Sequence, residues 1–284
     1  DLLIDAGAFR AAFESLGDAE RDALEQAAAR IEAYHRHQLD ADWSFTDEHG
    51  SVLGQRVQPL DRAGLYVPGG QAAYPSTVLM TAIPARVAGV EQVWVASPRP
   101  TPVTLAAAAI AGADGLLACG GAQALAALAS GVGPLPAVDF LCGPGNRWVT
   151  EAKRQLHGRV GIDMLAGPSE LLILADASAN PAELAADLIG QAEHDEDARP
   201  ILVSTEASLV LAVESELARQ LTDLPTAATA RTAIARQGIA VVCEDLGEAL
   251  RVCDEIAPEH LEVRLESAAQ ARALPALQHA GAGE

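Results

Sequence analysis

Short β-prone runs alternate with alanine-rich helical stretches from Gly64 onward, and this alternation restricts the fold more than any other feature of the sequence. It is the pattern expected when helices cross over between parallel strands that are buried on both faces. The length of 284 residues and the hydrophobic content of 50% allow two domains of ordinary size with buried cores. The sequence therefore predicts an α/β protein with parallel sheets.

The alternation falls into two series of similar size, without an internal sequence repeat. The first series predicts strands at 65–67, 93–96, 115–118 and 138–141 and helices at about 77–88, 102–111 and 122–128. The second series predicts strands at 171–174, 201–204, 239–242 and 261–265 and helices at 181–194, 208–221 and 246–256. We therefore expect two Rossmann-like open parallel-sheet units of related topology.

The residues before this alternation predict an N-terminal helical arm. Between residues 11 and 39 apolar side chains recur at helical spacing; they are Phe13, Leu16, Leu24, Ala28, Ile31 and Tyr34. Residues 43–61 are polar and irregular, and residues 47–50 are expected to form a turn between short extended pieces.

The charge balance argues against nucleic acid and membrane partners. The chain has 39 acidic and 19 basic residues, and the net charge of −20 repels the phosphates of nucleic acids and anionic lipids. No basic stripe reverses this field, and no apolar run reaches the roughly 20 residues that a membrane span needs. Small-molecule chemistry is therefore the favoured class of function.

The cysteines favour a reducing compartment. Four of them are widely spaced without a Cys-x-x-Cys pair: Cys119, Cys142, Cys243 and Cys253. This spacing is typical of small buried hydrophobic residues, and it argues against disulfides and against a cysteine zinc site. The chain begins at Asp1 without a signal-peptide pattern, and either terminus is expected to be an artificial boundary.

Glycine turns follow strands of the first series. Their sequences are Tyr66-Val67-Pro68-Gly69-Gly70, Gly120-Gly121-Ala122-Gln123 and Gly143-Pro144-Gly145-Asn146. Backbone amides exposed in such turns suit ligand phosphates, and the carboxyl ends of parallel strands meet at the edge where open α/β folds bind ligands. A plain tight turn that requires positive φ is the alternative for each of them. Neither G-x-G-x-x-G nor G-x-x-x-x-G-K-[ST] occurs, so any nucleotide would be held in a nonstandard way.

Two polar groups lie in the second series. Gln191 and His194 are three residues apart on a predicted helix and could reach one metal ion or ligand, although a solvated helix end is the alternative. Glu259 and His260 offer two bases, one for water and one for a hydroxyl proton. Both can serve one site only if the turn at Pro258 breaks the strand alternation, and an ordinary polar turn is the alternative.

Ser169 lies in a Gly-Pro turn between the two series. Its hydroxyl could point into a ligand cleft, and a plain connecting turn is the alternative. The remaining histidines receive no role; they are His35, His37, His49, His157 and His279.

In this order and spacing, six motifs resemble the histidinol dehydrogenase family: YVPGG, GGAQA, FLCGPGNRWVTEAKRQ, IDMLAGPSE, GQAEHD and APEHLE. The resemblance covers most of the chain, from about Gly64 to Val263. Each motif alone is weak, but their joint occurrence in order is specific. The resemblance implies a zinc-dependent enzyme that oxidises L-histidinol to L-histidine through bound L-histidinal, with two NAD⁺ used in succession.

The resemblance also implies roles for particular residues. Positions that contact NAD in the family are matched by Tyr66, Gln123 and Asn146. Positions that contact the substrate are matched by Ser169, Gln191, His194 and His260, and two of the zinc ligands are matched by Gln191 and His194. The catalytic pair is matched by Glu259 and His260.

At the level of the whole protein, the resemblance implies a cytoplasmic, intertwined homodimer. It implies a split α/β domain, residues 1–65 and 171–284, that carries the zinc and catalytic residues, and an inserted Rossmann-like NAD-binding domain, residues 66–170. The other zinc ligands, an Asp and a His, are expected in a C-terminal region that this chain lacks together with part of the N-terminus. A related dehydrogenase for another polar alcohol, an inactive truncated remnant that only binds ligands, and a metal hydrolase are the alternatives.

Overall fold

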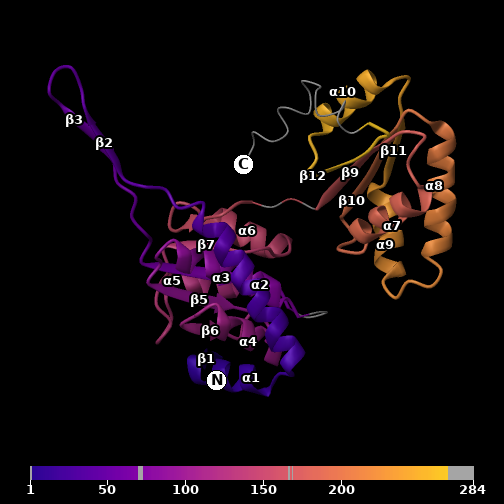
Figure 1. Cartoon of the computed structure of the whole chain (residues 1–284). Coiled ribbons are helices and arrows are strands. Elements are labelled where there is room, and N and C mark those ends of the chain that lie inside the picture. The colour runs from indigo at the N-terminus through magenta and orange to yellow at the C-terminus, as the bar shows by residue number, and fades with distance from the viewer. Residues whose placement is uncertain (1, 70–72, 166, 168, 268–284) are drawn as a thin grey trace. The chain divides into compact units, whose positions relative to one another are not determined.

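The computed structural model describes residues 2–69, 73–165, 167 and 169–267, and the chain divides into two compact units, Asp1–Ala166 and Gly167–Glu284 (Figure 1). Each unit has its own parallel sheet and its own buried clusters. The predicted α/β class with parallel sheets is confirmed. Gly70 and Pro168 of the predicted motifs, and residues 268–284 of the predicted second domain, lie outside the described residues.

The first unit is built on a six-stranded sheet in the order β1-β6-β5-β4-β7-β8. Its strands are β1 (Leu3–Asp5), β4 (Arg62–Tyr66), β5 (Gln92–Ala96), β6 (Gly115–Leu117), β7 (Phe140–Cys142) and β8 (Gly161–Ile162). All neighbours are parallel except β1, which pairs antiparallel with β6 at the edge. The crossovers therefore reverse direction between β4 and β7, which is the switch point of a Rossmann-type sheet.

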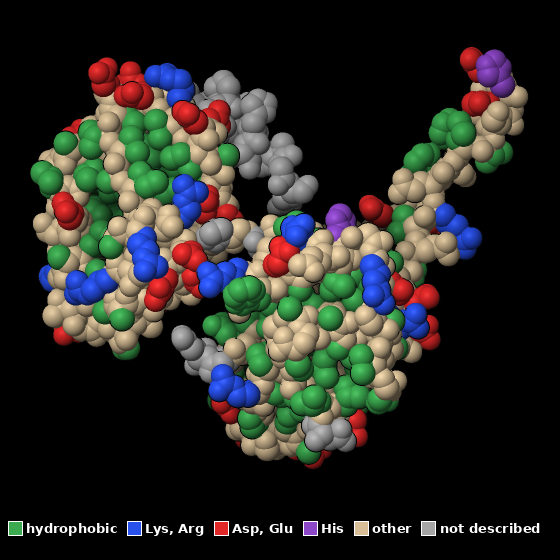
Figure 2. Space-filling view, turned by 180° about the vertical axis from the view of Figure 1, so that it is seen from behind, with side chains coloured by type: hydrophobic (Ala, Val, Ile, Leu, Met, Phe, Trp, Pro, Cys, Tyr) green, Lys and Arg blue, Asp and Glu red, His purple; other side chains and the backbone are tan. Residues whose placement is uncertain are grey.

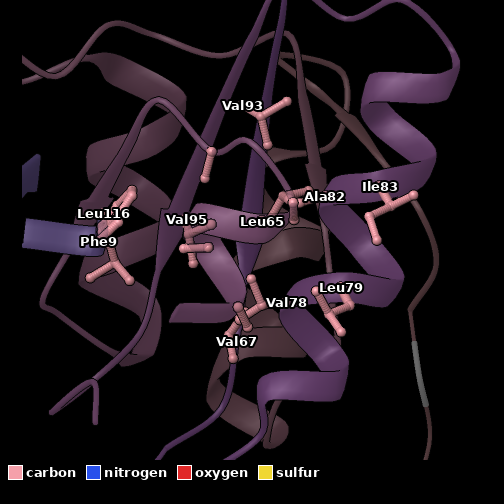
Figure 3. Packing of buried hydrophobic residues seen from close by; sticks show 14 of the residues in the cluster. Phe9, Leu65, Val67, Val78, Leu79, Ala82, Ile83, Val93, Val95 and Leu116 are labelled. Carbon is pink, nitrogen blue, oxygen red and sulfur yellow. The ribbon is translucent and has the colours of Figure 1, made fainter. Parts of the chain in front are cut away.

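Helices cover both faces of this sheet. They are α1 (Ala6–Ser15), α2 (Asp18–Arg36), α3 (Pro75–Val87), α4 (Pro102–Ile110), α5 (Gly121–Ser130) and α6 (Arg147–Leu156). Leu65 of β4 packs with Val78 and Leu79 of α3 on one face, as Figure 3 shows, whereas Tyr66 packs with residues of α5 and α6 on the other. Alternate residues of one strand are thus buried on opposite faces, so the strand has no polar face.

The predicted N-terminal helical arm is formed by α1 and α2, which belong to the first unit. The Asp5 side chain caps α1 by accepting a hydrogen bond of 3.1 Å from the Ala8 amide. Phe9 of α1 is 1% exposed and joins Ala28 of α2 in the same core as α3 and α4. The arm is therefore a packed layer of this unit.

Residues 43–55 form an exposed hairpin of β2 (Trp43–Thr46) and β3 (Val52–Gln55). The predicted turn between them is present, because the Asp47 carboxylate accepts hydrogen bonds from the His49 and Ser51 amides at 2.9 and 2.8 Å. The rings of Trp43 and Phe45 stack with centroids 6.2 Å apart. Figure 2 shows hydrophobic side chains along the surface of this hairpin.

The second unit has a four-stranded parallel sheet in the order β11-β10-β9-β12. Its strands are β9 (Glu170–Ala175), β10 (Arg199–Ser204), β11 (Ile239–Val242) and β12 (His260–Arg264), and its helices are α7 (Pro181–Ala192), α8 (Ala207–Gln220), α9 (Ala227–Gln237) and α10 (Leu246–Ile256). Residues of α10 pack on one face of the sheet, and residues of α7 and α8 pack on the other. The strand order repeats that of β6-β5-β4-β7, so the predicted relation in topology is confirmed.

Every predicted strand and helix of the two series overlaps an element of the structure. The sequence did not predict β1, β8, α6 and α9. Among the described residues, the four cysteines are free, as predicted. No helix within the described ranges is both long and apolar enough to cross a bilayer.

The predicted split domain is wrong in its N-terminal part. The residues before 66 belong to the first unit, together with those from 66 to 166, and not with the second sheet. The reason is that β4 is a central strand, which pairs with both β5 and β7, and that β1 pairs with β6. Residues 62–66 thus have strand neighbours on both sides within the first sheet, so they are part of this sheet and not of the second.

Gly143 allows the closest backbone approach at the switch point. Its φ is +119°, and a Cβ built there would lie 2.1 Å from the Tyr66 carbonyl oxygen. We predict that Gly143→Ala lowers the free energy of unfolding by about 1–3 kcal/mol more than Gly158→Ala does. Gly158 has a φ of +93° with no atom within 4 Å of the added Cβ, so it reports the cost of positive φ without the clash. Urea unfolding of both variants measures the difference, and equal losses would show that the two strands separate at no cost.

Candidate functional site

The residues predicted to contact a cofactor lie at the carboxyl ends of the first sheet's strands. We call Tyr66, Gln123 and Asn146 the carboxyl-edge group. Tyr66 ends β4, is 5% exposed, and accepts a hydrogen bond of 3.0 Å on its hydroxyl from the Gly121 amide. Its carbonyl lies against Gly143. Tyr66 therefore touches both of the other glycine turns, and the predicted convergence of the three turns is present.

Glycines permit these turns to close on one another. Gly120 and Gly69 both lie against Pro98, which follows β5, and a Cβ at either position would come within 3 Å of it. Gly121 has a φ of +73° and opens α5, whose first turn carries the exposed side chain of Gln123. The amide of Gln123 is thus presented to solvent beside the amino end of a helix.

Asn146 is the N-cap of α6. Its Oδ1 accepts hydrogen bonds of 3.1 and 3.2 Å from the Trp148 and Val149 amides, which fixes the start of the helix after the glycine turn. Trp148 is 61% exposed, and the Arg147 guanidinium lies 5.1 Å from the centroid of its ring. The amino ends of α5 and α6 both lie at this edge, and the positive ends of helix dipoles favour anions such as phosphates.

An ion pair between the buried Lys153 and the partly exposed Asp163, behind the third turn, was not predicted. Lys153 Nζ donates to the Gly143 carbonyl at 2.5 Å and to Asp163 at 2.6 Å, while Asp163 accepts from the Gly143 amide at 2.8 Å. Burial alone would raise the pKa of Asp163, but the hydrogen bonds from Lys153, Gly143 and Met164 together hold it below its ordinary value. One signal could have found this pair: Lys153 shares the apolar side of α6 with Val149.

Cys142, at the end of β7, is not a nucleophile at neutral pH. Burial, together with the negative charge and the hydrogen bond of Asp163, raises the pKa of the Cys142 thiol to about 12. Reactive cysteines have lowered pKa values, so this thiol has the opposite environment. The structure therefore gives no support to thiolate catalysis at this edge.

The residues predicted to act on the substrate lie at the opposite, amino ends of the second sheet's strands. We call Ser169, Gln191, His194, Glu259 and His260 the amino-edge group. Ser169 is exposed and precedes β9, and its carbonyl accepts from the Arg199 amide at 3.0 Å. His260 opens β12 in register with Leu171 of β9.

Glu259 and His260 come together as the turn hypothesis required. The distance between Glu259 Oε1 and His260 Nε2 is 3.8 Å, and their side chains are 51% and 63% exposed. Glu259 also accepts from the Glu170 amide at 3.3 Å, which ties the pair to the start of β9. Two residues before Glu259, Ala257 has a φ of +46°, a left-handed conformation that ends α10. The strand β12 begins only at His260, so Glu259 lies in the turn and outside the strand alternation. Both bases are thus accessible on one side of the sheet edge.

Gln191 and His194 do not share a helical face as predicted, because α7 ends at Ala192. His194 lies in the following turn, where its amide donates to the Gln191 carbonyl at 3.3 Å, and its side chain is exposed. Gln191 is 8% exposed, and its buried Nε2 has no hydrogen-bond partner in the structure as described. The negative end of the α7 dipole lies at this position and favours a cation.

The described residues by themselves do not form a metal shell. Within those ranges no group of three or more His, Cys, Asp or Glu side chains is placed to hold a metal ion. Among these residues no hydrogen bond or ion pair joins His194 to the Glu259–His260 pair. Gln191, through its amide oxygen, and His194, through an imidazole nitrogen, have the donor atoms for two ligands of an incomplete set.

The two sheets, the switch point with its glycine turns, and the acid–base pair define an α/β protein of the Rossmann-like class with separate carboxyl-edge and amino-edge groups. A model of the histidinol dehydrogenase family matches residues 1–282, and the chain belongs to this family. The likeness is supported by curated relatives and by solved structures.

Histidinol dehydrogenase from Bordetella parapertussis is 48% identical over 285 residues, which cover 99% of this chain and 64% of the relative. That from Pseudomonas aeruginosa is 48% identical over 286 residues, with the same coverage. The chain therefore spans 64% of the length of these curated relatives.

The crystal structure of histidinol dehydrogenase from Elizabethkingia anophelis matches with a TM-score of 0.87 at 33% identity, over 95% of this chain and 64% of that one. A propionaldehyde dehydrogenase from Rhodopseudomonas palustris with bound propionyl-CoA matches with a TM-score of 0.55 at 13% identity, over 93% of this chain and 75% of that one. This second likeness shows the fold alone.

We predict that alkylation of Cys142 by iodoacetamide rises about tenfold per pH unit from pH 7 to 10 without a plateau, because the thiol stays protonated below a pKa of about 12. Peptide mass spectrometry after timed quenching measures the rate at this residue. The same protein unfolded in urea is the control and should level off near the ordinary thiol pKa of about 8.5. A plateau below pH 9 in the folded protein would contradict the protonated state.

Proposed function

We propose that the complete protein is a zinc- and NAD-dependent histidinol dehydrogenase, which oxidises L-histidinol to L-histidine through bound L-histidinal. The observation that carries this proposal is the 48% identity to curated histidinol dehydrogenases over 99% of the chain. Each substrate molecule and one water give two hydrides to two NAD⁺ and release three protons as the alcohol becomes a carboxylate. Such a reaction needs a base for the alcohol and a base for water.

His260 is the proposed base for the alcohol. Its imidazole accepts the hydroxyl proton while the hydride leaves the carbon that carries this hydroxyl group. No charged alkoxide therefore has to persist. Its side chain is 63% exposed and therefore open to a substrate. The residue begins a strand, and the parallel pairing of β12 with β9 fixes its backbone.

Glu259 is the proposed base for water in the second half of the reaction. Its carboxylate takes a proton from the water that attacks the aldehyde carbon, and the hydrated aldehyde then loses the second hydride. The Glu170 amide donates a hydrogen bond to Oε2 of Glu259. This bond also fixes the position of the other carboxylate oxygen, Oε1. Glu259 Oε1 lies 3.8 Å from His260 Nε2, which suits two bases that serve the same carbon in succession.

Gln191 and His194 are the proposed zinc ligands of this chain, and the substrate would contact them together with Ser169 and His260. Bound zinc would supply a fixed positive charge that anchors the amino and imidazole nitrogens of the substrate. The ligand atom of Gln191 would be its amide oxygen, because the buried amide nitrogen, which has no hydrogen-bond partner among the described residues, is a donor and cannot bind a cation.

Tyr66, Gln123 and Asn146 are the proposed NAD contacts. NAD⁺ would accept the hydride in each half of the reaction. The exposed Gln123 amide and the amino ends of α5 and α6 provide donors and positive dipole ends for a pyrophosphate. We further propose, from the family likeness, a homodimer in the cytoplasm.

The proposal predicts that the complete protein with Zn²⁺ forms two NADH per L-histidinol, measured by absorbance. Glu259→Gln is expected to slow the oxidation of added L-histidinal by about 10²–10⁴-fold and the first hydride transfer from L-histidinol much less. The matched control is Glu255→Gln, since Glu255 is exposed on α10 four residues earlier. Absence of NADH from a folded, zinc-loaded protein would refute the function, and equal loss in both half-reactions would refute the restricted role of Glu259.

Zinc content provides a second test. His194→Ala in the complete protein is expected to lower bound zinc well below one per chain, because one ligand of the shell is lost. His157→Ala is the control, since His157 is an exposed histidine of the first unit. Plasma emission spectrometry after gel filtration measures the metal, and unchanged zinc in His194→Ala would remove this residue from the ligand set.

A further inference from the structure

Lys153 is the only lysine of the chain, and the other eighteen basic residues are all arginine. Its side chain is 5% exposed, so the one lysine ammonium group is buried. A buried charge requires partners, and Lys153 has them in Asp163 and the Gly143 carbonyl. None of the roles proposed above uses this residue.

The pair formed by Lys153 and Asp163 holds both polar groups of one residue. Lys153 Nζ binds the Gly143 carbonyl at 2.5 Å, and Asp163 Oδ2 binds the Gly143 amide at 2.8 Å. The third contact, between Lys153 Nζ and Asp163 Oδ1 at 2.6 Å, closes the ring. Gly143 therefore cannot rotate without breaking a hydrogen bond to a buried charge.

Gly143 is the position where this restraint matters. It lies against the Tyr66 carbonyl at the switch point, and it begins the turn that ends at Asn146. Lys153 is on α6, the helix that Asn146 caps. The turn is thus held at its start by the ion pair and at its end by the N-cap, with the same helix supplying both.

Lysine suits the space between the Gly143 carbonyl and the Asp163 carboxylate better than arginine does. A compact ammonium can approach a carbonyl and a carboxylate at 2.5 and 2.6 Å, whereas a guanidinium is a broad planar fork. The same unit shows where arginine is used instead: Arg86 forms a similar bridge with Asp114 and with the Gly112, Val90 and Glu91 carbonyls. Those groups precede β5 and β6, at the amino edge of the same sheet.

We infer that Lys153 is a positioning residue, which together with Asp163 holds the Gly143–Asn146 turn in the conformation that binds the dinucleotide. This inference rests on the proposed function. An ion pair needed only for stability could be replaced by apolar residues of similar volume, often without loss. The two hydrogen bonds to Gly143 are what such a replacement cannot supply.

The test measures how tightly the complete protein binds NAD⁺ and NADH. We expect Lys153→Met and Lys153→Arg to raise KM for NAD⁺, and Kd for NADH, at least tenfold, while kcat at saturating NAD⁺ and zinc content change less than threefold. Asp163→Asn keeps the volume but removes the charge and one of the two acceptor oxygens, so it serves where Lys153→Met does not fold. It is expected to raise KM in the same direction.

Arg86→Met and Asp114→Asn are the matched controls, because they break a charged bridge in the same unit at the opposite edge of the sheet. They are expected to lower stability in urea while KM for NAD⁺ stays within twofold. Hydrogen exchange of peptides that contain residues 143–149 should be faster in the Lys153 and Asp163 variants and unchanged in the controls.

The outcomes separate the inference from the function beneath it. If the unaltered protein binds no NADH, the proposed function fails and the inference fails with it. If it binds NADH and the Lys153 and Asp163 variants keep KM within twofold, or the controls raise KM equally, the pair is merely structural and only the inference is overturned. Rescue of KM by Lys153→Arg would show that charge suffices and would overturn the fit to a compact ammonium.

Discussion

Both sheets are buried on two faces by helices, and this burial decides where polar chemistry can lie. A polar side chain inside such a layer needs a hydrogen-bond partner, so ligand-binding groups are confined to strand ends and turns. Among the described residues, the buried polar or charged ones are Ser97, Thr104, Lys153, Gln191 and Ser204. Lys153 belongs to the support of the carboxyl-edge group and Gln191 to the amino-edge group itself. Two of these buried polar residues, Lys153 and Gln191, thus lie in or next to the groups with proposed functions.

The two units share a strand order, but their proposed functional residues lie at opposite edges of the two sheets. Amino ends of helices meet the carboxyl edge of a parallel sheet, as α5 and α6 do, and their dipoles favour anions. Carboxyl ends of helices return to the amino edge, as α7 does before β10, and favour cations. A dinucleotide with a pyrophosphate and a divalent metal therefore suit different edges of the same topology. The placement of Tyr66 and Gln191 follows this electrostatic division.

Much of this arrangement could be predicted from the sequence, because the strands are short apolar runs between turns. The core helices α3, α4 and α7 were equally visible as alanine-rich or leucine-rich stretches. In contrast, α6 directly follows the glycine turn and is largely polar, so it lacks the apolar composition that marked the other helices. The bridge between Lys153 and Asp163 depends on the pairing of β7 with β8, which local sequence does not reveal. The wrong split domain has the same cause, since the two neighbours of β4 are set by tertiary pairing.

Lys153 and Gln191 also differ in how their burial is compensated. Lys153 is satisfied by contacts within the chain, so the turn that it holds is formed before any cofactor arrives. In Gln191 the buried amide nitrogen has no hydrogen-bond partner among the described residues, at a cost of about 1–3 kcal/mol. A metal bound by the amide oxygen leaves this N–H donor unpaired, so metal binding at Gln191 does not by itself remove that cost. The turn that Lys153 holds is therefore organised in advance, which suits the proposed cofactor because it would exchange during each turnover, whereas the burial of Gln191 is not fully compensated within the described residues.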